Sequence, residues 1–133
     1  MQLLLKKHGR FDGQDPLLSS DGKSLLNLYT IKEIPEFVTG VEGKALRTDG
    51  YSTWMDTTTE GDVSSLSGWF ALESYPTDTA AFMGIRDMAG TSVAVCVDRY
   101  GELLLGMGQN GSYSYCSLKT KVDRFSGCMW SLI

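Results

Sequence analysis

The clearest pattern in this sequence is an alternation of apolar and small or polar side chains centred on residue 95. Three valines occupy alternate positions from 93 to 97, with Ser, Ala, Cys and Asp around them. Successive side chains of a β-strand point to opposite faces, so this period predicts a strand with its valines facing a core. The chain turns at residues 99–101 (RYG), and the alternation resumes over 102–107. The side chains expected in one shared interior are Val93, Val95, Val97, Leu103 and Leu105, joined by Trp69 or Phe70.

Similar short segments recur along the chain, each bounded by residues that favour turns. We expect strands near residues 25–34, 51–56, 67–74, 80–86 and 112–118. The dipeptide Asp49-Gly50 predicts a tight turn between a strand signal at 43–48 and the next one. Strand signals separated by roughly 8–12 residues are typical of antiparallel sandwiches. The sequence therefore predicts an all-β, antiparallel two-sheet sandwich at residues 25–133, preceded by a loop-rich segment at 1–24.

Two stretches carry a resemblance to a known family. Residues 43–55 (GKALRTDGYSTWM) resemble the opening phrase of concanavalin A-like, laminin G-like jelly-roll modules, with Thr48 where the family usually has Phe. Residues 40–46 (GVEGKAL) and 49–53 (DGYST), together with residues 68–77 (GWFALESYPT), also resemble the laminin G-like insert of some bacterial glycoside hydrolases of the β-fructosidase type. The resemblance implies a concanavalin A-like jelly roll that serves as an accessory, carbohydrate-binding module of a glycoside hydrolase. One fold hosts many functions, so other functions remain open.

The last strand signal, at residues 129–133 (MWSLI), falls where modules of this family continue with further strands. The resemblance therefore implies a jelly roll that is incomplete at its C-terminus. A sheet edge left without a neighbour recruits other strands. We accordingly expect self-association through an uncovered sheet edge at this end.

Catalytic motifs are not evident in the sequence. Glycoside hydrolysis requires two carboxylates facing one groove, and neither E-x-D-x-E nor E-x-x-x-E spacing occurs. Residues 54–56 (WMD) and 86–88 (RDM) only partly match β-fructosidase motifs, and His8 is the single histidine. We predict no catalytic residue. A glycoside hydrolase in its own right, and a structural or protein-interaction sandwich without a sugar ligand, are the alternatives.

Aromatic side chains are the candidates for binding a sugar, because such platforms serve this purpose in the family. Tyr113 and Tyr115 are two residues apart on one predicted strand and should share a face. The predicted carbohydrate-binding residues are Tyr51, Trp54, Tyr113 and Tyr115. The alternative is that these are ordinary strand residues, since Tyr and Trp favour sheets.

Charge and composition exclude several partners. The net charge is −4, with no basic stripe that would neutralise the phosphates of a nucleic acid. The longest unbroken apolar run, at residues 93–97 (VAVCV), has five residues, far short of the ~20 residues that span a bilayer. No export signal is visible in the sequence. This fits a cytoplasmic protein, and it also fits part of a longer protein, which for the resembled family implies a periplasmic or extracellular location.

Metal and thiol chemistry receive little support from the sequence. We predict no cofactor and no metal site, although single loop residues leave a structural calcium ion as an alternative. These residues are Asp56, Glu60, Asp62, Asp87 and Asn110. Three cysteines at wide spacing predict free thiols. A Cys96–Cys116 bridge would require that their strands be neighbours.

Overall fold

The computed structural model describes residues 27–31, 36–41, 43–50, 52–56, 65–124 and 127–132. These residues contain antiparallel strands and no helix, which confirms the predicted all-β class. The loop-rich segment predicted for residues 1–24 lies outside the described residues. The strands are β1 (Asn27–Tyr29), β2 (Glu36–Thr39), β3 (Lys44–Arg47), β4 (Trp54–Asp56), β5 (Leu66–Ala71), β6 (Ala80–Arg86), β7 (Thr91–Val97), β8 (Glu102–Gln109), β9 (Ser112–Lys121) and β10 (Gly127–Leu132).

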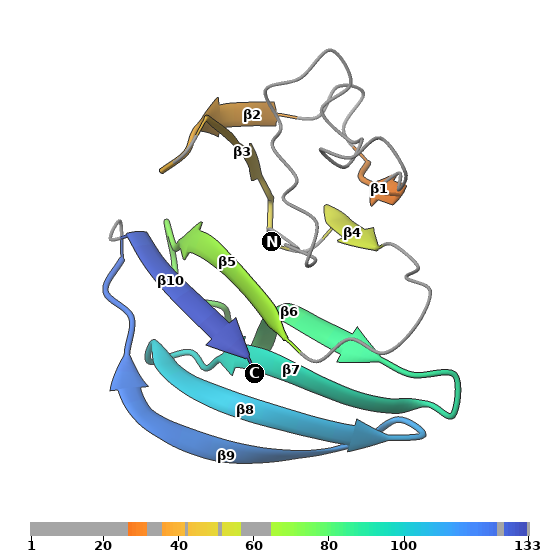
Figure 1. Cartoon of the computed structure of the whole chain (residues 1–133). Helices are drawn as coiled ribbons and strands as arrows, with labels where there is room; N and C mark the ends of the chain where they lie inside the picture. Colours follow the sequence, from red (N-terminus) through yellow and green to blue (C-terminus); the bar gives the residue numbers. More distant parts are fainter. Residues whose placement is uncertain are drawn as a thin grey trace.

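The largest sheet has four strands in the order β6-β7-β8-β9 (Figure 1). The hairpin predicted from the alternation is confirmed, because Val95 pairs with Leu105 and Val97 with Leu103. Its turn is held by Asp98, whose carboxylate accepts hydrogen bonds from the backbone N–H groups of Tyr100 (2.8 Å) and Glu102 (2.9 Å). Such local capping by aspartate explains why a turn forms here without tertiary help.

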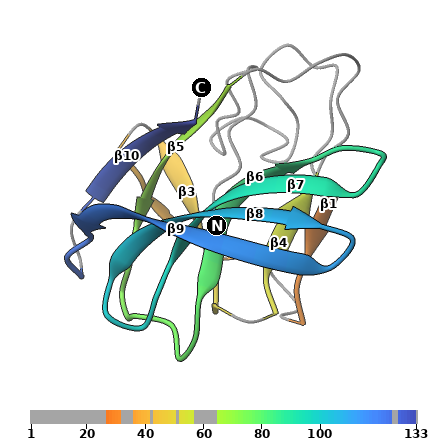
Figure 2. The ribbon, with the colours of Figure 1, turned by 90° about the horizontal axis from the view of Figure 1, so that it is seen from below.

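The main core lies between the four-stranded sheet and strand β5. Phe70 of β5 stacks on Phe82 of β6, with ring centroids 3.9 Å apart. Figures 1 and 2 show β5 and β10 lying over one face of the large sheet, as the second layer of a sandwich. The buried side chains of this core are Phe82, Met83, Val95, Val97, Leu103 and Val122, with Phe70, Leu72 and Ile85 packed against them.

The predicted core is largely confirmed, with two positions at its margin. Val95, Val97 and Leu103 are buried, whereas Val93 and Leu105 are half-buried. Phe70, rather than Trp69, joins these side chains. The reason is the period of the strand, which turns neighbouring residues of β5 to opposite faces.

Three two-stranded sheets complete the described fold: β1 with β4, β2 with β3, and β5 with β10. The turn predicted at Asp49-Gly50 is present, with Gly50 at φ +80°. The strands on either side of it do not pair with each other, because β3 pairs with β2 and β4 pairs with β1. The predicted C-terminal strand is confirmed as β10, which pairs along its whole length with β5.

Candidate functional site

Two of the predicted sugar-binding residues come together on β9. Tyr113 is opposite Gly108 of β8, and Tyr115 is opposite Gly106. These positions share the face of the sheet that points away from the Val95–Leu105 pair and therefore away from the core. The two rings are nearly parallel, at 16°, with centroids 6.4 Å apart. We call Tyr113 and Tyr115 the tyrosine pair.

Glycines of β8 allow the tyrosine pair to lie close to the sheet. A Cβ atom at Gly108 would be 2.6 Å from Cε1 of Tyr113, and one at Gly106 would be 3.3 Å from Cε1 of Tyr115. Each ring thus occupies the space that a side chain on the neighbouring strand would fill. The residues remain 55% and 51% exposed. The result is an aromatic surface supported from below by backbone and open to solvent.

The other predicted binding residues do not join this surface. Trp54 is on β4 and stacks on Tyr29 of β1, with centroids 4.0 Å apart and planes 11° apart. These two strands form a sheet of their own, separate from the one that carries the tyrosine pair. Tyr51 lies outside the described residues. The structure therefore brings two of the four residues together and places Trp54 elsewhere.

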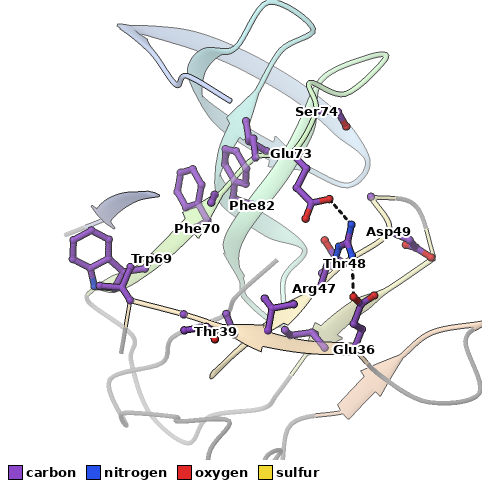
Figure 3. Close-up of a pocket in the computed structure, with 18 residues that line it drawn as sticks. Glu36, Thr39, Arg47, Thr48, Asp49, Trp69, Phe70, Glu73, Ser74 and Phe82 are labelled. Atoms are coloured by element: carbon purple, nitrogen blue, oxygen red, sulfur yellow. Dashed lines mark hydrogen bonds and ion pairs between the residues drawn. The ribbon is translucent and has the colours of Figure 1, made fainter. Parts of the chain in front are cut away.

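A hollow that the sequence did not indicate lies between the β2–β3 hairpin and β5 (Figure 3). Its volume is ≈ 720 Å³. Apolar side chains of Val38, Leu46 and Phe70 line it together with charged residues at one end. The sequence missed this hollow because its two walls come from segments whose packing no local pattern specifies.

Arg47 dominates the charged end of the hollow. One of its guanidinium nitrogens donates to Glu36 and the other to Glu73, both at 2.8 Å (Figure 3). The hydrogen bond to Glu73 and then that to Glu36 raise the pKa of Arg47 above its ordinary value. One positive charge thus bridges two carboxylates, one from β2 and the other from the loop after β5.

This arrangement does not suit a glycosidase pair. One carboxyl of such a pair must hold a proton so that it can act as general acid. Both Glu36 and Glu73 instead form an ion pair with Arg47, each at 2.8 Å. The two carboxylates are therefore better explained as partners of Arg47 than as catalytic groups.

Aspartates in turns bind backbone groups. Asp49 accepts hydrogen bonds from the N–H groups of Ser52 and Thr53, and Asp87 accepts one from Thr91. Within the described ranges, no three His, Cys, Asp or Glu side chains form a group that could hold a metal ion. The calcium candidates Glu60 and Asp62 lie outside those ranges, and Asp56 accepts a hydrogen bond from Asn27.

Cys96 and Cys116 are free thiols and do not face each other. Cys96 is buried on β7 and Cys116 is exposed on β9, with β8 between their strands. Cys96 shares a face with Ala94 and the tyrosine pair, whereas Cys116 points to the opposite face. The requirement for a bridge, neighbouring strands, is not met. Burial raises the pKa of the Cys96 thiol.

The described part of the chain contains no helix of the length and apolarity needed to cross a membrane. No protein family, curated protein or solved structure matches this chain. Its function is therefore inferred from its own residues and their geometry.

Proposed function

We propose that this chain is a non-catalytic carbohydrate-binding module, and that the tyrosine pair is its binding surface. The single observation that carries the proposal is the pair of nearly parallel, half-exposed rings on the outer face of the four-stranded sheet. A sugar ring presents a face of C–H groups that packs on an aromatic face, while its hydroxyl groups remain hydrated or bond to polar neighbours. Two such rings in a row suit consecutive units of an oligosaccharide.

Rigidity of the support favours binding. The rings lie on β9, which is paired with β8 over most of its length. They already lie against the β8 glycines, so they cannot move much closer to the sheet. A surface that is already ordered loses less conformational entropy when a ligand binds. The hydroxyl of Ser92, which lies close to Gly108 on the same face, adds a polar group beside the rings.

The wider assignment rests on the sequence resemblance. We propose that the module is of the concanavalin A-like jelly-roll kind and accompanies a bacterial glycoside hydrolase, with β-fructans as the first ligands to test.

Calorimetric titration with inulin, levan, laminarin and cellohexaose tests the proposal. We expect binding of at least one of these ligands, and a loss of about fivefold in affinity for each of Tyr113→Ala and Tyr115→Ala, which corresponds to about 1 kcal/mol per lost aromatic contact. Tyr100→Ala is the matched control, because Tyr100 is 68% exposed in the turn between β7 and β8. It should bind as the parent does.

Two results would contradict the proposal. Binding that is unchanged in the double variant Tyr113→Ala, Tyr115→Ala would exclude the tyrosine pair as the surface. Hydrolysis of any of these glycans by the purified chain, abolished by Glu36→Gln or Glu73→Gln, would replace the binding role with a catalytic one.

A further inference from the structure

Strand β9 forms one edge of the four-stranded sheet. It is ten residues long and pairs with β8 on one side only (Figures 1 and 2). Within the described ranges no strand lies along its other side. Alternate N–H and C=O groups on that side therefore face outward, where another strand can pair with them.

The features that usually protect an edge are gathered at one end of β9. Residues 112–118 include no proline and no charged side chain. The irregular geometry comes later, with Lys119 at φ +56° and a register shift against β8 between Glu102 and Leu104. Lysines are typical guards of a free edge, and here they stand only at 119 and 121. Seven consecutive residues are thus open to pairing.

The other edge of this sheet is less suitable. Strand β6 has a bulge at Phe82, ends in Arg86 and lies beside β5, whose Phe70 stacks on Phe82. A bulge and a covering element both discourage pairing. The open edge of the four-stranded sheet is therefore β9.

We propose that residues 112–118 of β9 pair with the same residues of a second copy of this chain, antiparallel and about a twofold axis at Tyr115. The two four-stranded sheets then form one continuous sheet. Charge decides the direction of pairing. Antiparallel pairing places the lysines of the two copies at opposite ends of the shared strands, whereas parallel pairing in register would set each lysine beside its equivalent.

The register centred on Tyr115 has a consequence for the tyrosine pair. Tyr115 lies opposite Tyr115 of the second copy, and Tyr113 lies opposite the second copy's Ser117. Side chains on one face of paired strands are neighbours, and aromatic pairs across strands stabilise a sheet. The dimer would thus carry one row of four tyrosines. The dimer itself does not depend on sugar binding, but a function for the longer row rests on the proposed function.

Sedimentation across a concentration series tests the dimer without any sugar, so its failure is distinct from failure of the proposed function. We expect a dimer in the parent protein. In the proposed register, residue 114 of each copy lies opposite residue 116 of the other. The double variant Ser114→Lys, Cys116→Lys therefore sets lysines directly opposite each other at both of these pairs and should be monomeric. Both side chains are exposed, so the fold should survive, as the melting temperature will report. The control is Thr77→Lys, Thr91→Lys, which adds the same charge at exposed positions away from β9 and should remain dimeric.

Cross-linking tests the register. Residue 114 lies opposite residue 116 of the second copy, and opposite residues in paired strands have Cα atoms about 4.5–5.5 Å apart, within reach of a disulfide. In a Cys128→Ser background, Ser114→Cys should form a covalent dimer through Cys116 under copper–phenanthroline oxidation. Ser112→Cys is the matched control and should stay uncross-linked. A parent that is monomeric at hundreds of micromolar overturns the dimer, and cross-linking of Ser112→Cys in preference to Ser114→Cys overturns the register.

Discussion

Substitution of Gly101 by alanine should destabilise the protein for two separable reasons. Gly101 ends the turn between β7 and β8 with φ +83°, a conformation that L-residues rarely adopt. A Cβ atom there would also lie 2.7 Å from Cε1 and Cζ of Tyr75. That ring has little freedom to move, because its hydroxyl donates a 2.9 Å hydrogen bond to the carbonyl of Val122, and Val122 in turn donates one to the carbonyl of Gly101.

The expected cost is the sum of the two effects. A left-handed backbone conformation costs a residue with a Cβ atom about 1–2 kcal/mol. Forcing an extra carbon into a packed site adds about 1–3 kcal/mol. Gly101→Ala should therefore lower the free energy of unfolding by about 2–5 kcal/mol, and the melting temperature should fall by roughly 3–5 °C for each kcal/mol.

Gly111 is a matched control in the next turn of the same sheet. Its φ is +87°, but no atom lies within 4 Å of the position of its Cβ. Gly111→Ala should therefore show the backbone cost alone, about 1–2 kcal/mol. Urea unfolding followed by tryptophan fluorescence and circular dichroism measures both variants.

A double-mutant cycle separates the clash from the backbone cost. In a Tyr75→Ala background the clash is absent, so Gly101→Ala should cost about as much as Gly111→Ala. Equal losses for Gly101→Ala and Gly111→Ala in the parent protein would refute the clash with Tyr75. An undiminished loss at Gly101 in the Tyr75→Ala background would refute it as well.

Two further predictions concern the interior of the four-stranded sheet. Val95→Asp should unfold the domain at room temperature, because Val95 is 3% exposed and an unpaired carboxylate there costs several kcal/mol. Met88→Asp, at a fully exposed position, is the control. A folded Val95→Asp protein with the parent melting temperature would exclude this core. Iodoacetamide near neutral pH should alkylate exposed Cys116 and spare Cys96 until the protein unfolds, as mass spectrometry will show. Burial blocks access of the reagent to Cys96, and it also raises the pKa of the Cys96 thiol, so that less of the reactive thiolate is present. Equal native rates at the two thiols would contradict the burial of Cys96.

Local patterns determined the hairpin and the face of the tyrosine pair. The valines at alternate positions and the turn held by Asp98 specify a strand, a turn and a return strand within 20 residues, because each signal acts between near neighbours. For the same reason, Tyr113 and Tyr115 had to share one face of a strand. The all-β class followed from the recurrence of such segments.

The tertiary structure alone decided which strands pair across long distances. The turn at Asp49-Gly50 is local, yet β3 and β4 on its two sides join different partners, and no pattern in the sequence states this. Trp54 consequently stacks on Tyr29 instead of joining the other predicted aromatics. Pairing of distant strands depends on the burial of whole faces, which a period of two residues cannot specify.

The candidate sites show the same division. The sequence placed the two tyrosines on one face, but the register of β8 against β9 set Gly106 and Gly108 beneath their rings. The hollow with Arg47 between Glu36 and Glu73 arises from two segments that meet only in the folded chain. Side-chain periodicity is a property of the strand itself, whereas a surface built by several strands exists only once packing has fixed their order and register.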